Sequence, residues 1–179
     1  MPRFFQQTAL ALILCALAVS AFAAPRPRLS LLNENSRPPL FTLPDTQGQP
    51  VRLDTFLRRK RIVLLAIPAG PGLQGTAFLR AAREHRAEFD ARDLVVLALA
   101  PPQSPLFPSF DASPVHMLHD ANARIAHAYG GSSGTPAFSL IGKDGGIKLA
   151  SRTFPSLREL FAAIDAMPMR REERSQRGR

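Results

Sequence analysis

The 179-residue sequence has a single cysteine, Cys15, and it lies within an apolar segment near the N-terminus. We expect this segment to be a signal peptide, because Arg3 supplies a positive charge and Ala21-Phe22-Ala23 is a small-residue cleavage site. The apolar run over residues 9–19 is too short to span a bilayer comfortably. An uncleaved anchor is the alternative. Cleavage after Ala23 predicts a periplasmic or secreted protein with no thiol, which excludes disulfides, cysteine-ligated zinc and cysteine catalysis within the mature chain.

Acidic residues are few relative to basic ones, with 14 Asp and Glu against 23 Lys and Arg and a formal net charge of +9. This balance favours contact with phosphate, acidic polymers or an anionic membrane surface, without selecting among them. The sequence has no recognised nucleic-acid motif and no interleaving of aromatic and basic residues. Together with export, this predicts that nucleic acid is not a partner. After cleavage we expect no stable membrane anchor.

The chain divides into four parts by composition. After the signal peptide over 1–23, we predict a Pro- and Arg-rich linker over 24–39, one globular domain over 40–168 and a basic flexible tail over 169–179. There is no internal repeat. The mature length is sufficient for one domain with a sizeable core.

The first half of the domain predicts a strand, a loop, a helix and a second strand. Short strands over 40–43 and 51–53 come first, with Asp54 as N-cap of the following turn. The apolar runs over 62–67 and 94–100 are typical of strands buried on both faces. Between these runs, a helix carries an apolar stripe of Phe78, Ala82, His85 and Phe89. Short connections make the two buried strands a parallel pair, so the loop after the first opens at the carboxyl edge of the sheet.

The second half predicts a helix, a hairpin and a last helix. Residues 101–114 are proline-rich and irregular, and a short strand over 115–118 follows. Asp120 is expected to cap a helix that runs through Tyr129. The segments over 138–141 and 147–150 form an antiparallel hairpin. Ser156-Leu-Arg-Glu159 is a capping box that opens the last helix.

Several motifs together carry a family resemblance. The segment over 41–53, Phe-Thr-Leu-Pro-Asp-Thr-Gln-Gly-Gln-Pro-Val-Arg-Leu, resembles the entry motif of the peroxiredoxin and TlpA-like branch of the thioredoxin-like superfamily. Gly134-Thr135-Pro136 is similar to the cis-proline loop of that fold. The resemblance implies an α/β fold with a central mixed sheet, βαβ then ββα, flanked by helices.

Two C-terminal stretches resemble a narrower family. Gly142-Lys-Asp-Gly-Gly-Ile-Lys148 and Ile164-Asp-Ala-Met-Pro-Met-Arg170 are similar to a family of exported bacterial domains of unknown function. That resemblance implies a relation to domains of equarin and the sushi-repeat proteins, a location and a fold, but no established activity.

The central loop lacks the nucleophile of these relatives. Against the thioredoxin pattern C-G-P-C, Ala69-Gly70-Pro71-Gly72 keeps the inner Gly-Pro and replaces both cysteines. Against the peroxiredoxin pattern P-x-x-x-T-x-x-C, Pro68 matches, whereas Gly72 and Gly75 stand at the threonine and cysteine positions. Alanine and glycine cannot form a mixed disulfide or attack a peroxide, so we expect no enzymatic activity and no cofactor.

The predicted function is therefore a non-catalytic binding module for a protein, a peptide or an anion. The candidate site joins the loop at the start of the helix to the proline loop; its residues are Pro68, Ala69, Gly70, Pro71, Gly72, Gln74, Gly75, Thr135 and Pro136. An antioxidant or thiol-exchange enzyme remains an alternative by fold resemblance. A periplasmic metal binder that uses His116 and His119 is another, although the two side chains should point to opposite faces of a strand.

Overall fold

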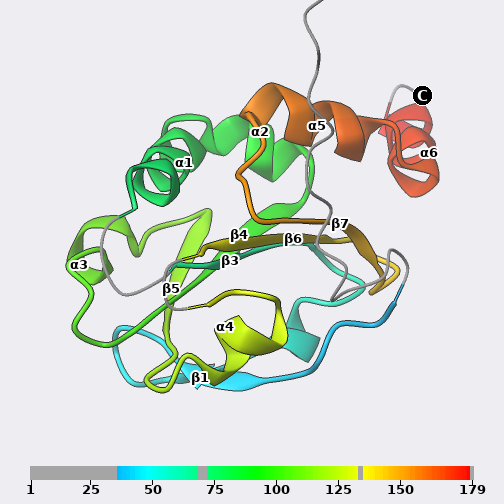
Figure 1. Ribbon diagram of the computed structural model, residues 1–179. Coiled ribbons are helices and arrows are strands. Elements are labelled where there is room, and N and C mark those ends of the chain that lie inside the picture. The colour runs from blue at the N-terminus through cyan, green and yellow to red at the C-terminus, as the bar shows by residue number, and fades with distance from the viewer. Residues whose placement is uncertain (1–35, 68–71, 133–134, 178–179) are drawn as a thin grey trace, which may run out of the picture.

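The computed structural model describes residues 36–67, 72–132 and 135–177. In these residues the chain forms a five-stranded mixed sheet with helices on both faces and a small two-stranded sheet beneath it (Figure 1). The predicted signal peptide, most of the predicted linker and residues 68–71 of the predicted loop lie outside the described residues. Within the described part of the chain, no helix combines the length and apolar character needed to cross a membrane.

The strands and helices that the sequence predicts appear in the predicted order, and two unpredicted helices are added. The strands are β1 (Thr42–Pro44), β2 (Pro50–Arg52), β3 (Arg61–Ala66), β4 (Leu94–Ala100), β5 (Val115–His119), β6 (Ala137–Ile141) and β7 (Ile147–Ser151). The helices are η1 (Leu53–Thr55), α1 (Leu73–Glu84), α2 (Arg86–Ala91), α3 (Phe107–Phe110), α4 (Arg124–Ala128), α5 (Leu157–Asp165) and α6 (Pro168–Arg177). The two unpredicted helices are α3, in the segment expected to be irregular, and α6, in the expected tail.

The main sheet has the strand order β5-β4-β3-β6-β7. The parallel pairing of β3 with β4 and of β4 with β5 confirms the predicted crossover, and β6 runs antiparallel to β3 and to β7. Residues 62–66 of β3 and all residues of β4 are buried, as their continuous apolar runs predict, and Arg61 at the start of β3 is buried as well. The carboxyl ends of β3, β4 and β5 therefore meet at one edge of the sheet.

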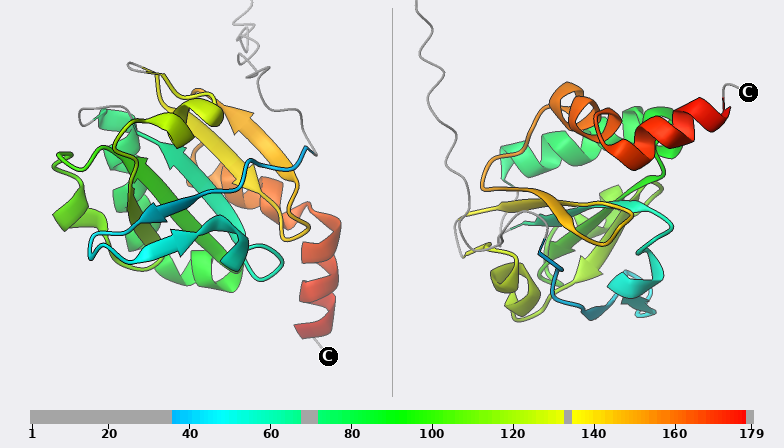
Figure 2. Two further views of the ribbon diagram at one scale, coloured as in Figure 1. Left: turned by 90° about the horizontal axis from the view of Figure 1, so that it is seen from below. Right: turned by 90° about the vertical axis from the view of Figure 1, so that its right-hand side faces the viewer.

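Side chains of the central strands alternate between two cores. Val63 and Leu65 of β3 belong to the core beneath α1, α2 and α5, whereas Ile62 and Leu64 belong to the core beneath β1, β2 and α4. The views in Figure 2 show these two layers on opposite faces of the sheet. Burial on both faces fixes the register, because a slip of one residue would exchange the two sets.

The helix after the central loop is broken, which the apolar stripe did not predict. α1 ends at Glu84, and α2 begins at Arg86 after His85 leaves helical geometry with φ −101° and ψ 31°. Phe89 is fully buried and its ring lies 5.4 Å from that of Phe161 on α5. His85 is exposed, so its predicted place on the buried stripe was wrong. The break turns α2 so that Phe89 faces the core while His85 faces solvent.

Asp54 does not cap a helix with its side chain. It lies within η1, and its carboxylate accepts hydrogen bonds from Arg52, with 3.0 Å between Nε and Oδ1. The predicted cap position is instead occupied by Arg52, whose side chain makes no cap hydrogen bond.

Both predicted ends of the domain need correction. The last residues of the predicted linker pack on the domain: the Ser36 carbonyl accepts from the Ile147 amide at 3.0 Å, and the Pro39 carbonyl accepts from the Tyr129 hydroxyl at 2.7 Å. The predicted flexible tail is the helix α6 as far as Arg177. Charge alone suggested a solvated tail, but Arg170 and Glu173 of α6 form ion pairs with the body of the domain.

Candidate functional site

A small pocket opens at the carboxyl edge of the main sheet, and we call it the edge pocket. Its volume is about 130 Å³, and its lining comes from the ends of β3 and β4, the segment from Asp120 into α4, and the chain around Thr135. The lining residues are Ala66, Ile67, Leu99, Ala100, Pro101, Asp120, Ala123, Ala126, His127, Gly131, Ser132 and Thr135. Ligands of open α/β sheets bind outside the carboxyl ends of the strands, which is the position of this pocket.

Small side chains and one close backbone approach create the hollow. A Cβ atom on Gly131 would lie 3.0 Å from the Ala126 carbonyl oxygen and 3.1 Å from the Ala66 Cβ. The glycine therefore lets the chain after α4 pass closer to β3 than a larger residue would. The polar side chains of the lining are those of Asp120, His127, Ser132 and Thr135.

Asp120 organises the wall of the edge pocket. Its side chain is only 4% exposed, and its carboxylate accepts hydrogen bonds from the amides of Ile125 at 3.4 Å and Ala126 at 2.8 Å. The sequence predicted Asp120 as a helix cap, and it does satisfy amides of the first helical turn. However, α4 begins later than predicted, after Ala123 with φ +51°. A short turn between Asp120 and the helix thus bends the chain around the pocket.

The structure brings one of the predicted site residues, Thr135, to the edge pocket. Its backbone exchanges hydrogen bonds with Ser132, at 3.0 and 3.1 Å. Gly72 and Gln74 are exposed at the start of α1, and Gly75 is buried against Ile67. The other predicted loop residues, Pro68, Ala69, Gly70 and Pro71, lie outside the described residues.

Pro136 is half-buried beside Thr135, but the cis peptide bond expected before it is not found. Among the peptide bonds between described residues, the cis bond precedes Pro114 instead. Since X-Pro bonds differ little in energy between their two isomers, tertiary context decides the isomer and a motif alone does not.

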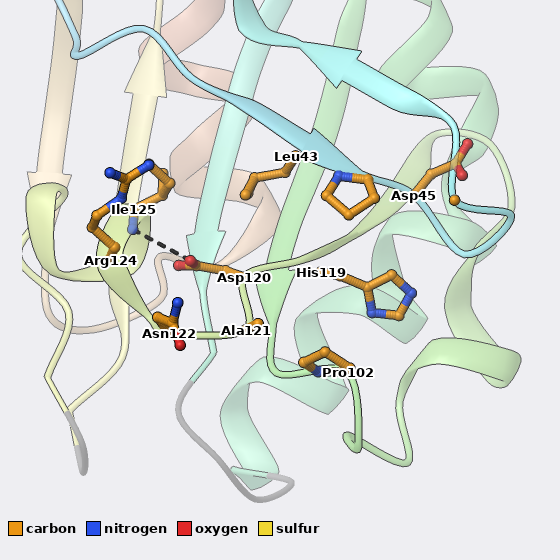
Figure 3. A pocket seen from close by; sticks show the side chains of 11 residues that line it. Leu43, Asp45, Pro102, His119, Asp120, Ala121, Asn122, Arg124 and Ile125 are labelled. Atoms are coloured by element: carbon orange, nitrogen blue, oxygen red, sulfur yellow. Dashed lines mark hydrogen bonds between the residues drawn. The ribbon is translucent and has the colours of Figure 1, made fainter.

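A wider cleft lies on the other side of the segment that follows β5, and we call it the hairpin cleft (Figure 3). It has a volume of about 590 Å³ between the β1–β2 hairpin and the start of α4. Its lining residues are Leu43, Pro44, Asp45, Gly48, Pro102, His119, Asp120, Ala121, Asn122, Arg124 and Ile125. Asp120 contributes to both hollows, so the turn that it begins is the wall between them.

The two histidines proposed as metal ligands have different surroundings. His116 packs against Phe56, with 5.7 Å between ring centroids, whereas His119 lines the hairpin cleft. Burial lowers the pKa of His116, and the negative charges of Asp111 and Asp45 oppose this shift only in part. Across the described ranges, no group of three or more His, Cys, Asp and Glu side chains is arranged to hold a metal ion.

Sequence reasoning missed most of the edge pocket. Ile67 was predicted only as the end of a buried strand, and Asp120 only as a cap. Both nevertheless follow the rule that residues directly after parallel strands gather at one edge, and this rule could have identified them. Gly131 carried no comparable signal, because its close approach to Ala66 depends on how α4 packs.

Comparisons with known proteins agree with this architecture. The profile of a family described as "Domain of unknown function (DUF4174)" matches residues 52–173. A search of the curated proteins found no matching sequence. Similar solved structures include the yeast mitochondrial 1-Cys peroxiredoxin, at 19% identity and TM-score 0.65 over 79% of each chain. Peroxidoxin BcpB from Mycobacterium tuberculosis has 20% identity and TM-score 0.63 over 76% of this chain and 98% of its own.

A third similar structure is that of a proposed thiol:disulfide interchange protein, DsbE, from Chlorobium tepidum. It has 18% identity and TM-score 0.61 over 74% of this chain and 99% of its own. At such low identities these likenesses establish the fold alone, which is thioredoxin-like as predicted, with a central mixed sheet between helices.

Proposed function

The chain belongs to the DUF4174 family of domains of unknown function, and from this premise we propose that it is an exported, non-catalytic binding module whose ligand enters the edge pocket. The protein has the fold of thiol enzymes but would not carry out their reactions. Cys15 is the single cysteine of the sequence, and every position of the loop over 68–75 is occupied by a residue without a thiol. Thiol exchange and peroxide reduction of the peroxiredoxin type both begin with a thiolate, so this loop has no group that could start either reaction.

The edge pocket is the observation that carries the proposal. Its walls are mainly small apolar side chains, and an apolar cavity of about 150 Å³ is large enough to hold benzene. A pocket of about 130 Å³ thus has the size of one branched aliphatic side chain. Ser132 and Thr135 lie at its polar side, and their hydroxyls make no hydrogen bond to other described residues. This combination suits a peptide segment that inserts one apolar side chain into the pocket and forms backbone hydrogen bonds with the two hydroxyl groups.

Titration of the ¹⁵N-labelled protein with Ac-Gly-Gly-X-Gly-Gly-NH₂ peptides tests the proposal, with X as Leu, Val or Gly. Burying an aliphatic side chain contributes about 1.5–3 kcal/mol. The Leu peptide should therefore bind about tenfold more tightly than the Gly peptide, or better. The largest amide shifts should occur at Ile67, Gly131 and Thr135.

A pair of alanines on α4 supplies a matched control. Ala126 lines the edge pocket, whereas Ala128 is exposed and does not. Ala126→Leu should fill the pocket and abolish the preference for the Leu peptide, and Ala128→Leu should leave it unchanged. Equal binding of all three peptides to the unaltered protein, or the same loss in both variants, would contradict the proposal.

Export and the absence of thiol-type activity can each be tested separately. Mass spectrometry of the protein from fractionated cells should find an N-terminus at Ala24 in the exported fraction, and a chain that keeps Met1 in the cytoplasm would contradict export. Peroxide consumption and insulin reduction by the purified protein should not exceed a buffer blank, and activity above the blank would favour a thiol-type enzyme. The relation to equarin and sushi-repeat domains stays a prediction.

A further inference from the structure

The hairpin cleft has charged side chains of opposite sign on its two sides. Figure 3 shows Arg124 beside Ile125 on one side and Asp45 on the other, with Leu43, Pro102, Asp120 and His119 between them. The volume of about 590 Å³ falls within the range of about 300–1,000 Å³ that is usual for ligand pockets. The cleft therefore presents a cation on one side and a carboxylate on the other. The lining between them combines the apolar side chains of Leu43 and Pro102 with the polar ones of His119 and Asp120.

The carboxylate side of the cleft is held in a fixed position. Asp45 Oδ1 accepts hydrogen bonds from the amides of Gln47 and Gln49, both at 2.8 Å, within the turn of the β1–β2 hairpin. The backbone of Asp45 also bridges to Leu118 of β5, which holds the turn against the main sheet. These contacts leave Oδ2 of the half-buried carboxylate for a ligand.

Arg124 forms the cationic side of the cleft, and it also lines a neighbouring hollow with Arg52 and Asp54. Arg124 is exposed at the first position of α4, and its guanidinium makes no ion pair or hydrogen bond within the described part of the chain. The nearest lining carboxylate in sequence, Asp120, already accepts the amides of Ile125 and Ala126. Arg124 is thus available to pair with an anionic group that enters the cleft.

We propose that the hairpin cleft is a second binding site, which takes an extended peptide segment with an acidic residue against Arg124, an apolar residue over Leu43 and Pro102, and a basic residue against Asp45. Charge complementarity at both ends selects this occupant over a simple anion, which would use Arg124 alone. The site is separate from the edge pocket, so its test does not depend on the result obtained there.

Binding of five fluorescent, end-blocked peptides tests the proposal. Two are mixed in charge, Glu-Gly-Leu-Gly-Lys and its reverse sequence. The others are an acidic form with Glu at both ends, a basic form with Lys at both ends, and a mixed form with Gly in place of Leu. One of the two mixed peptides with Leu should bind most tightly. Each matched charge should contribute about two- to fivefold in affinity. Tighter or equal binding of the acidic form would indicate an anion site and overturn the proposal.

Single substitutions should change the preference in a defined direction. Arg124→Glu should make the basic form the tightest binder. Asp45→Asn keeps an acceptor for the turn amides and removes the charge, so the acidic form should then bind as well as the mixed one. Arg152 is exposed after β7, away from the cleft, and Arg152→Glu supplies the same change in net charge.

The control variant Arg152→Glu should rank the peptides by affinity in the same order as the unaltered protein. All affinities can shift together because the net charge has changed. If Arg124→Glu and Arg152→Glu alter the ranking of the peptides in the same way, or if no peptide binds, the proposed site is wrong. Ala126→Leu in the edge pocket should leave the ranking intact. A loss confined to Ala126→Leu would assign the peptides to the edge pocket and also overturn the proposal.

Discussion

The guanidinium of Arg61, at the start of β3, donates two hydrogen bonds to the carboxylate of Glu173 on α6, with 3.1 Å between Nη2 and Oε1 and 3.2 Å between Nη1 and Oε2. Only 1% of the Arg61 side chain is exposed. Lys143 joins the same carboxylate at 2.8 Å and also contacts Asp93 at 2.9 Å. This network attaches α6 to the edge of the sheet opposite the edge pocket, and the family match, which ends at residue 173, includes it.

Removal of the charge on Glu173 should destabilise the domain strongly. Glu173→Gln leaves the buried guanidinium of Arg61 without a negative partner, and the loss of one member of a buried pair costs on the order of 3 kcal/mol. Urea unfolding measures the change in the free energy of unfolding. Glu172→Gln, on the exposed neighbour, should change it by less than about 0.5 kcal/mol. Equal effects of the two substitutions would contradict the role given to the network.

The same carboxylate makes stability dependent on acid pH. Burial by itself would raise the pKa of Glu173, but hydrogen bonds and charge from Lys143 and Arg61 outweigh it and lower the pKa to about 2. Its contribution is therefore fully present above the ordinary glutamate value near 4.5 and is lost as the pH falls toward 2. The free energy of unfolding should decline through this window less steeply in Glu173→Gln. Parallel pH profiles for the two proteins would refute this assignment.

The capping box of α5 should contribute measurably to stability. The Glu159 amide donates to Ser156 Oγ at 3.3 Å, and the Ser156 amide donates to Glu159 Oε2 at 2.9 Å. Ser156→Ala should lower the free energy of unfolding by about 1 kcal/mol, because it leaves a helix amide without its acceptor. Ser156→Thr keeps the hydroxyl and should restore most of that loss. Thermal unfolding of the three proteins gives the comparison, and a loss in Ser156→Thr as large as in Ser156→Ala would argue against the cap.

Two glycines with equally open surroundings should respond differently to a methyl group. A Cβ atom added to Gly145 or Gly72 would meet nothing within 4 Å, but Gly145 has φ +80° whereas Gly72 has φ −60°. Gly145→Ala should destabilise the β6–β7 hairpin by about 1 kcal/mol, since an alanine is strained in the left-handed region. Gly72→Ala should stay within about 0.5 kcal/mol of the unaltered protein. Urea unfolding of both variants decides this, and similar effects would mean that φ is not the cause.

The sequence predicted the elements of the sheet well because their signals are local. The apolar runs of β3 and β4, the turn between β6 and β7 and the Ser156 capping box each need only neighbouring residues to be recognised. The break at His85 has no such signal. After the break, Phe89 contacts Phe161 on α5, which is distant in sequence.

The edge pocket lies at the edge of the sheet where the sequence predicts a site, but most of its lining residues were not predicted, and the site itself stays a prediction. The expectation of a site at the carboxyl edge follows from parallel strands, and the edge pocket lies there with Thr135 in its lining. The close approach of Gly131 to Ala66 and the turn after Asp120 create the hollow itself. Both depend on how α4 packs against the sheet, which no local pattern encodes.

The sequence by itself determined that no thiol stands in the central loop, and it determined the order of the strands, because residue identity and periodicity are properties of the chain. Tertiary structure decided which charges are buried and which hollows open. Arg61 and Glu173 are 112 positions apart, and only packing turns a basic strand end and a charged C-terminal segment into one buried network. In the same way, Asp45 and Arg124 become two sides of one cleft only when the β1–β2 hairpin folds against α4.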